Sequence, residues 1–126
     1  MNISFNKRGA FTLIEIMIVV GIIAMLVAMA APNFTKQMGS AKIGVIKSNL
    51  RLIDTAKMSW AVDNKKNEGD VPTEEEISAY LKGSKMPTPA AGETYHVEAI
   101  GQEPYAVSEN PIGDIKAGTK IYTATE

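Results

Sequence analysis

The sequence contains no cysteine and only one histidine, His96. Without cysteine there is no disulfide, no thiolate-bound metal and no thiol nucleophile. A lone histidine on an alternating strand is usually a surface or partly buried side chain rather than a general base. The sequence also has no glycine-rich phosphate loop and no His/Asp/Glu cluster with metal-ligand spacing. We therefore predict a protein that is not an enzyme and that holds no metal or cofactor.

Charge is nearly missing from one long stretch. Between Phe11 and Ala31 the only ionisable side chain is Glu15, and residues 16–31 are all apolar or small. A helix needs about 20 such residues to span a bilayer, and adding residues 11–14 reaches that length. Lys7 and Arg8 precede the stretch, so the positive-inside rule places the N-terminus in the cytoplasm. We predict one membrane-spanning helix, in which Glu15 is costly unless it meets a partner.

The remaining charges are unevenly distributed. Residues 32–67 hold seven basic and two acidic side chains, whereas residues 68–126 hold four basic and eleven acidic ones. Such asymmetry can steer association between copies, or it can be a solvated face on each part. The basic residues lack interleaved aromatic side chains, so we predict no direct nucleic-acid partner.

After Pro32, which we expect to kink or loosen the helix, apolar side chains recur at helical spacing. This stripe, which we expect to pack on a small sheet, consists of Ile43, Ile46, Leu50, Ile53, Ala56 and Trp60. The opposite, solvent-facing side is predicted to carry Lys47, Arg51, Asp54 and Lys57, with Arg51 within reach of Asp54.

The C-terminal half reads as a small mixed domain. Residues 63–70 form a polar loop, and two lysines stand where an EF-hand would need oxygen ligands. Thr73 and Glu76 match a capping box, which predicts a second helix with Ile77, Tyr80 and Leu81 buried and Gly83 at its end.

Strands follow the second helix. Residues 94–100 and 105–108 alternate around a turn at 101–104 and predict a hairpin, and a third short strand is expected within 120–125. Together the patterns predict an α+β fold: a long N-terminal helix packed on a small antiparallel sheet, with one short extra helix.

Residues 7–16, Lys-Arg-Gly-Ala-Phe-Thr-Leu-Ile-Glu-Ile, resemble the class III leader of type IV pilins and type II secretion pseudopilins. The resemblance covers roughly residues 7–34 and includes Pro32. It implies that a prepilin peptidase cuts between Ala10 and Phe11 and that the new Phe11 amine is methylated. The family usually has glycine before the cut, and here Gly9 lies one step earlier. A cut after Gly9 is the alternative.

The resemblance implies a pilin-like fold with four parts: a leader at 1–10, a transmembrane and assembly helix at 11–31, its amphipathic continuation at 32–67, and a globular head at 68–126. The expected function is that of a structural subunit of a type IV pilus-like or type II secretion pseudopilus filament. Its partners would be the prepilin peptidase/methyltransferase, copies of itself and related pilins, the inner-membrane assembly platform and the lipid bilayer. Glu15 would serve assembly by meeting the Phe11 amine of a neighbour. The filament would lie in the periplasm or outside the cell.

Two other interpretations use the same residues. Ala28-Met29-Ala30 after an apolar run also resembles an ordinary signal-peptide cut near Ala30, which would release a soluble secreted protein. A membrane-anchored adhesive or sensory domain is the third class. The sequence does not decide between secretion, motility and DNA-uptake machines, although the short, cysteine-free head slightly favours a pseudopilin.

Overall fold

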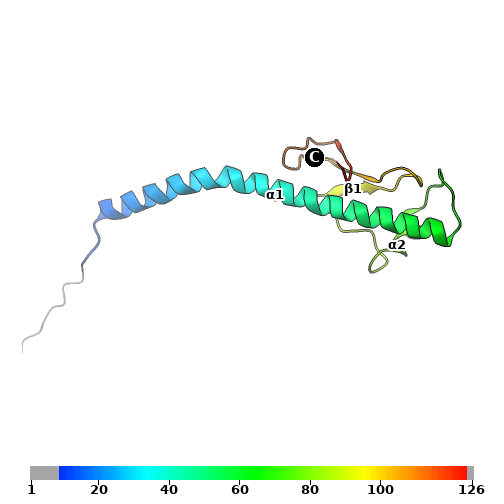
Figure 1. The fold of residues 1–126 in the computed structure, drawn as a ribbon. Helices are drawn as coiled ribbons and strands as arrows, with labels where there is room; N and C mark the ends of the chain where they lie inside the picture. The colour runs from blue at the N-terminus through cyan, green and yellow to red at the C-terminus, as the bar shows by residue number, and fades with distance from the viewer. Residues whose placement is uncertain (1–8, 125–126) are drawn as a thin grey trace, which may run out of the picture. The chain divides into compact units, whose positions relative to one another are not determined.

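The computed structural model describes residues 9–124 and has two helices and three strands in that range. The helices are α1 (Leu13–Asp63) and α2 (Glu74–Ser78), and the strands are β1 (Glu93–His96), β2 (Tyr105–Ser108) and β3 (Lys120–Ile121) (Figure 1). This is the predicted α+β pilin-type fold. The chain divides into two compact units, one ending at Phe34 and the other, here called the head unit, running from Thr35 to Glu126.

Helix α1 continues through Pro32, which lies inside it. Proline has no amide hydrogen, so the helix lacks one hydrogen bond at this position. The helix ends at Asp63, four residues before the predicted boundary at 67. It ends there because Lys65 takes a positive φ of 50°. The backbone amide of its neighbour Lys66 then donates to the Ala61 carbonyl at 2.9 Å. The predicted polar loop follows.

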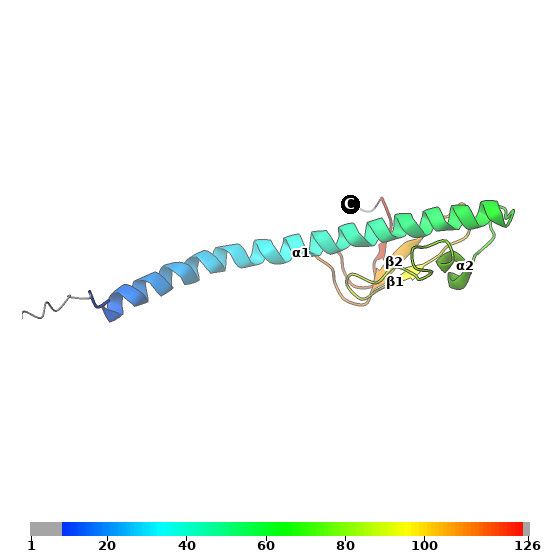
Figure 2. The same cartoon turned by 90° about the horizontal axis from the view of Figure 1, so that it is seen from below.

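The core of the head unit lies between α1 and the sheet, which run side by side in both views (Figures 1 and 2). One cluster joins α1 to the sheet and to the loop before β3; its members are Ile46, Leu50 and Ile53 of α1, Tyr95, Ala106 and Ile121 of the sheet, and Ile112 of the loop. A second cluster joins Ala56 and Trp60 to Ile77 of α2. The predicted apolar stripe is therefore the buried face of the helix, and its removal from water drives this packing.

The sheet is antiparallel with the order β1-β2-β3. The predicted hairpin is confirmed, with His96 opposite Tyr105, but β1 ends at His96 rather than at Ile100. Strand β3 has two residues, fewer than the expected 120–125. The capping box of Thr73 and Glu76 is present, but α2 is shorter than predicted.

One predicted position is wrong. Lys57 was placed on the solvent face of α1, yet only 2% of it is exposed. Asp54 pairs with Lys57, at 3.3 Å from the ammonium nitrogen to Oδ1, in place of the expected Arg51. Lys57 lies on the buried side because the backbone carbonyls of the segment after β1 supply oxygen partners for its ammonium group.

Candidate functional site: the N-terminal helical segment

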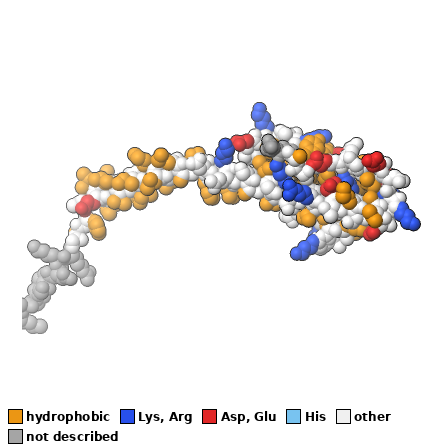
Figure 3. Space-filling model, viewed as in Figure 1, with side chains coloured by type: hydrophobic (Ala, Val, Ile, Leu, Met, Phe, Trp, Pro, Cys, Tyr) orange, Lys and Arg blue, Asp and Glu red, His pale blue; other side chains and the backbone are white. Residues whose placement is uncertain are grey.

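The N-terminal unit has an apolar surface that no residue between 9 and 124 covers. Every side chain from residue 9 to residue 34 is exposed, and Phe11 is 81% exposed. Hydrophobic side chains cover this part of the chain in the space-filling view (Figure 3). By length and composition, α1 is the one helix among the described residues that is able to cross a membrane. Apolar surface of this extent needs lipid or protein against it.

Glu15 is held by its own chain at the start of this segment. The Thr12 amide donates to Oε2 of Glu15 at 2.7 Å, and the Thr12 hydroxyl donates to the same oxygen at 3.0 Å. In return, the Glu15 amide donates to the Thr12 hydroxyl at 3.3 Å. These reciprocal bonds form a capping box, which satisfies backbone donors that the first turn of a helix leaves without partners.

Sequence reasoning missed this role of Thr12, although the signal was available. Thr12-Leu13-Ile14-Glu15 has the same Thr-x-x-Glu pattern as Thr73-Glu74-Glu75-Glu76, which was recognised as a capping box. Both pairs form the same bonds in the structure. Glu15 thus has a local partner in Thr12 even though the residues around it are apolar.

The predicted cleavage residues lie just before the helix. Gly9, Ala10, Phe11 and Thr12 are not helical, and α1 begins at Leu13. The peptide bond between Ala10 and Phe11 is therefore outside the hydrogen-bonded helix. The leader charges Lys7 and Arg8 lie outside the described residues, and Pro32 lies inside α1, away from the cap.

Among residues 35–124 of the head unit, Glu93 is the one buried carboxylate, and it lies within a network of hydrogen bonds. It accepts from the Tyr95 hydroxyl at 2.5 Å and from the Ala90 and Ala91 amides at 2.9 and 2.7 Å. Asn49 of α1 donates to the Tyr95 oxygen at 2.8 Å. Burial acts to raise the pKa of Glu93, but the hydrogen bonds outweigh it and leave that pKa below its ordinary value. Burial and the bond to Glu93 raise the pKa of Tyr95.

A row of aromatic side chains crosses the outer face of the sheet. His96 stacks on Tyr105 with 4.7 Å between ring centroids, and Tyr105 lies 5.8 Å from Tyr122. The Lys120 ammonium lies 4.1 Å from the centre of the Tyr105 ring. His96 thus contacts a cross-strand neighbour, a packing role. Within residues 9–124, no group of three or more His, Cys, Asp or Glu side chains is placed to hold a metal ion.

A close contact fixes a C-terminal loop to α1. Gly39 of the helix is buried against Gly113, and a Cβ placed on Gly39 would lie 2.5 Å from the Gly113 Cα. Nearby, Lys36 pairs with Asp114 at 3.7 Å between Nζ and Oδ2, with both side chains largely exposed. The two glycines are therefore required for the loop to reach the helix.

Comparison with known proteins shows which family the N-terminal residues resemble. Residues 5–31 match the family described as the prokaryotic N-terminal methylation motif. The chain is 49% identical over 57 residues to the type IV major pilin protein PilA of Myxococcus xanthus, a match covering 44% of this chain and 26% of that protein. It is 45% identical over 49 residues to prepilin peptidase-dependent protein A of Clostridium perfringens, covering 39% of this chain and 35% of the relative.

A third relative is the type II secretion system core protein G of Pseudomonas aeruginosa, 36% identical over 59 residues, covering 47% of this chain and 42% of that protein. The matches therefore span between about a quarter and two fifths of the relatives' length. No solved structure matches the chain.

The apolar helix, its capped start and the matched motif define a prepilin-type N-terminal segment. The predicted resemblance to type IV pilins and type II secretion pseudopilins is confirmed by these relatives. The motif covers the residues that an ordinary signal peptide would occupy, so a secreted protein cut near Ala30 is not favoured.

Proposed function

We propose that this chain is a structural subunit of a type IV pilus-like or type II secretion pseudopilus filament and is not an enzyme. The observation that carries the proposal is the uncovered apolar surface of residues 13–34 within a chain that matches the N-terminal methylation motif. Before assembly, the lipid of the bacterial inner membrane covers this surface, with the N-terminus in the cytoplasm. In the filament, the same surface of other copies and of related pilins replaces the lipid.

Processing separates the leader from the assembly helix. A prepilin peptidase cuts between Ala10 and Phe11, and the new amine of Phe11 is methylated. The non-helical, exposed backbone at residues 9–12 supports this step, because proteolysis concentrates at exposed terminal segments outside regular structure. The leader charges Lys7 and Arg8 keep the cleavage site at the cytoplasmic face.

Assembly requires Glu15 to change partners. In the single chain, its carboxylate accepts hydrogen bonds from Thr12. In the filament, it pairs with the Phe11 amine of a neighbour, which keeps its charge when methylated. The exchange of a local hydrogen bond for an ion pair in an apolar surrounding favours the assembled state, and the inner-membrane assembly platform brings the two groups together.

The head unit offers a second contact surface for neighbouring copies. Met38, Val45 and Leu52 recur every seven residues on α1, so they share one side of the helix, and all three are exposed. Lys42 lies four residues after Met38 and three before Val45, so a basic side chain borders this side of the helix, and the C-terminal part of the chain is acidic. Opposite charges on neighbouring copies support close approach along this side.

Intact mass with N-terminal fragment sequencing of the mature protein, purified from membranes of its native host, tests the proposal. A chain that begins at Phe11 with one added methyl group is the expected result. A chain that begins at Ala31 would mean release by ordinary signal peptidase and would end the filament proposal. An unprocessed chain in a host with an active prepilin peptidase would contradict the cleavage step.

A further inference from the structure

Lys57 is the one buried lysine among residues 9–124. It lies at the wall of a cavity of about 260 Å³ between α1 and the segment that joins β1 to β2. A lysine ammonium is costly to bury unless oxygen atoms replace its water shell. The atoms around the Lys57 Nζ atom therefore show how its charge is compensated.

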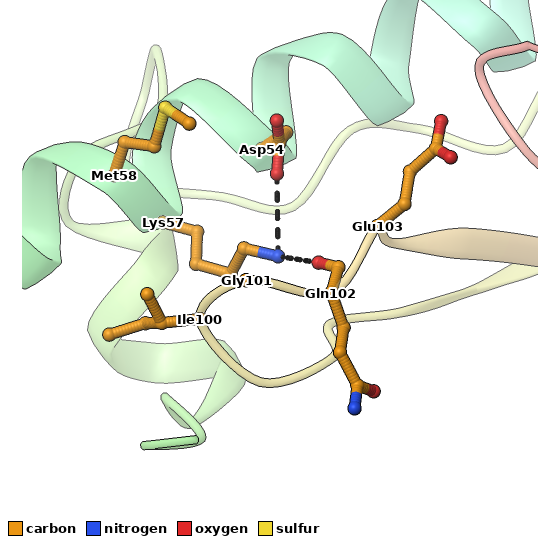
Figure 4. A pocket seen from close by; sticks show the side chains of 7 residues that line it. All are labelled: Asp54, Lys57, Met58, Ile100, Gly101, Gln102 and Glu103. Atoms are coloured by element: carbon orange, nitrogen blue, oxygen red, sulfur yellow. Dashed lines mark hydrogen bonds and ion pairs between the residues drawn. The ribbon is translucent and has the colours of Figure 1, made fainter. Parts of the chain in front are cut away.

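Three oxygen atoms meet the Lys57 ammonium. It donates to the backbone carbonyl of Gln102 and lies 3.3 Å from Oδ1 of Asp54 (Figure 4). It also donates to the Ala99 carbonyl at 3.3 Å. An ammonium group has three donors and no acceptor, so each donor has one oxygen. The helix supplies the cation and one anion, and a turn far away in sequence supplies the two carbonyls.

The turn from Ala99 to Gln102 is held by backbone hydrogen bonds, so the exchange rates of its amide hydrogens measure whether the turn is closed. The Gln102 amide donates to the Ala99 carbonyl at 3.0 Å, and Gly101 between them takes a positive φ of 89°. The turn is also joined to the loop after α1, because Ile100 donates to Asp70 at 2.9 Å and Gly69 donates to Ile100 at 3.1 Å. The negative ends of the Ala99 and Gln102 carbonyl dipoles both point at the Lys57 ammonium, whose charge offsets their mutual repulsion.

We propose that the Ala99–Gln102 turn and Asp54 form a cation site that Lys57 fills as a cation tethered to the helix. The positive charge of Lys57, and not the packing of its aliphatic stem, closes the turn. When the side chain is cut back, the site accepts a free primary alkylammonium ion of the same length. The inference concerns the head unit and does not depend on filament assembly.

The first test compares Lys57→Met with the control Lys42→Met in the full-length chain in detergent, by amide hydrogen exchange at single-residue resolution. Methionine keeps the volume of the stem and removes the charge. We expect the Gly69, Ile100 and Gln102 amides to exchange at least tenfold faster in Lys57→Met than in the control, with the amides around Leu50 unchanged. Unchanged exchange at the three amides, or an equal increase throughout the head unit, would overturn the proposal.

The second test uses Lys57→Ala, which removes three methylene groups and the ammonium. These are the atoms of n-propylammonium, so that ion is the probe, with tetramethylammonium at the same ionic strength as the control because it has no N–H donor. We expect n-propylammonium alone to restore slow exchange at Ile100 and Gln102. Equal effects of the two ions would overturn the proposal. If Lys57→Ala does not fold, the first test, which compares Lys57→Met with Lys42→Met, decides alone.

Discussion

Thr12 joins the start of α1 to the proposed cleavage site. Its hydroxyl both donates to Glu15 and accepts the Glu15 amide, and valine has the same shape without the hydroxyl. In an apolar environment a chain gains by continuing the helix, which satisfies its backbone internally. We expect Thr12→Val to let α1 extend towards Ala10 and to slow cleavage, followed as conversion of precursor to mature chain over time. Thr55→Val is the matched control, because Thr55 is an exposed threonine within α1. Equal cleavage rates in the two variants would remove the positioning role of the cap.

Glu15 is predicted to be dispensable for insertion and required for assembly. Glu15→Ala removes the one charge of the apolar segment, so membrane insertion should persist or improve. Filaments should be lost, because the Phe11 amine of each neighbour would have no counter-ion. Membrane fractionation and electron microscopy of sheared filaments measure the two effects. The control is Glu74→Ala, which removes an exposed carboxylate of the head unit. Normal filaments in Glu15→Ala would show that the role given to this residue is wrong.

Glu93 should make the head unit sensitive to acid. Its pKa is lower in the folded chain than in the unfolded chain, where it is about 4.3. Its contribution to stability is therefore complete above about pH 4.3 and is lost as the pH falls through the folded-state pKa. We expect Glu93→Gln to lower the free energy of unfolding by about 1–3 kcal/mol near pH 7 and by less at about pH 3.

Denaturant unfolding of the full chain, followed by the fluorescence of its single tryptophan, Trp60, measures this difference. Trp60 is buried in the head unit and so reports on its folding. Glu75→Gln, at an exposed glutamate, is the control. A stability loss in Glu93→Gln that is the same at both pH values would contradict the assigned role of its charge.

Single buried polar residues were the hardest to predict. Ile46, Leu50, Ile53, Lys57 and Trp60 follow one another at three- and four-residue steps, so spacing alone places Lys57 on the buried face. Its charge argued for the solvent face, and this argument was wrong because the compensating carbonyls come from residues more than 40 positions away. Glu93 was missed although Ala90, Ala91 and Tyr95, which donate to it, lie within three residues. Its burial depends on how the sheet packs against α1, where Asn49 meets Tyr95, and local sequence does not show that contact.

At the scale of elements, the contact between α1 and the loop around Gly113 depends on a missing side chain. Gly39→Ala places a methyl group 2.5 Å from the Gly113 backbone, so the loop must move. We expect a loss of about 1–3 kcal/mol in the free energy of unfolding. Gly44→Ala is the matched control, because nothing lies within 4 Å of its Cβ position and alanine is the better helix former by about 1 kcal/mol. The two variants should shift the midpoint of thermal unfolding in opposite directions. A stabilising Gly39→Ala would show that the loop moves at no cost.

Helices and strands could be predicted where the sequence pattern that specifies them lies within a few neighbouring residues. The Thr73–Glu76 cap, the apolar stripe of α1 and the alternating hairpin all appear where expected. Element ends were less predictable, because they depend on contacts between distant residues. The pairing of the Gly69–Asp70 segment with Ile100 takes that residue out of β1, and this pairing links parts of the chain 30 residues apart.

At the scale of the whole molecule, the two units differ in what they need for stability. Both core clusters use only residues from Ile43 onward, and the head unit begins at Thr35. A fragment of residues 35–126 is therefore expected to fold in water without the apolar segment. Circular dichroism should show helix and strand and a cooperative thermal transition. A fragment with neither helix nor strand would contradict the division into units.

The N-terminal half of the molecule was the most predictable from sequence. The Phe-Thr-Leu-Ile-Glu stretch and the apolar run pointed to prepilins, and the match of residues 5–31 to the N-terminal methylation motif bears this out. The matched motif ends at residue 31, so the sequence gives no comparable indication of what the head unit does.

The cap at Thr12 has a consequence for the order of events during biosynthesis. All of its bonds join residues within four positions of each other. It can therefore close while the nascent chain is still short, before the ribosome has made β1 or the Lys57 partners. If the chain is processed as proposed, cleavage at the membrane does not depend on whether the rest of the chain has folded. A chain with a defective head would then still be cut, and quality control would have to act at polymerisation.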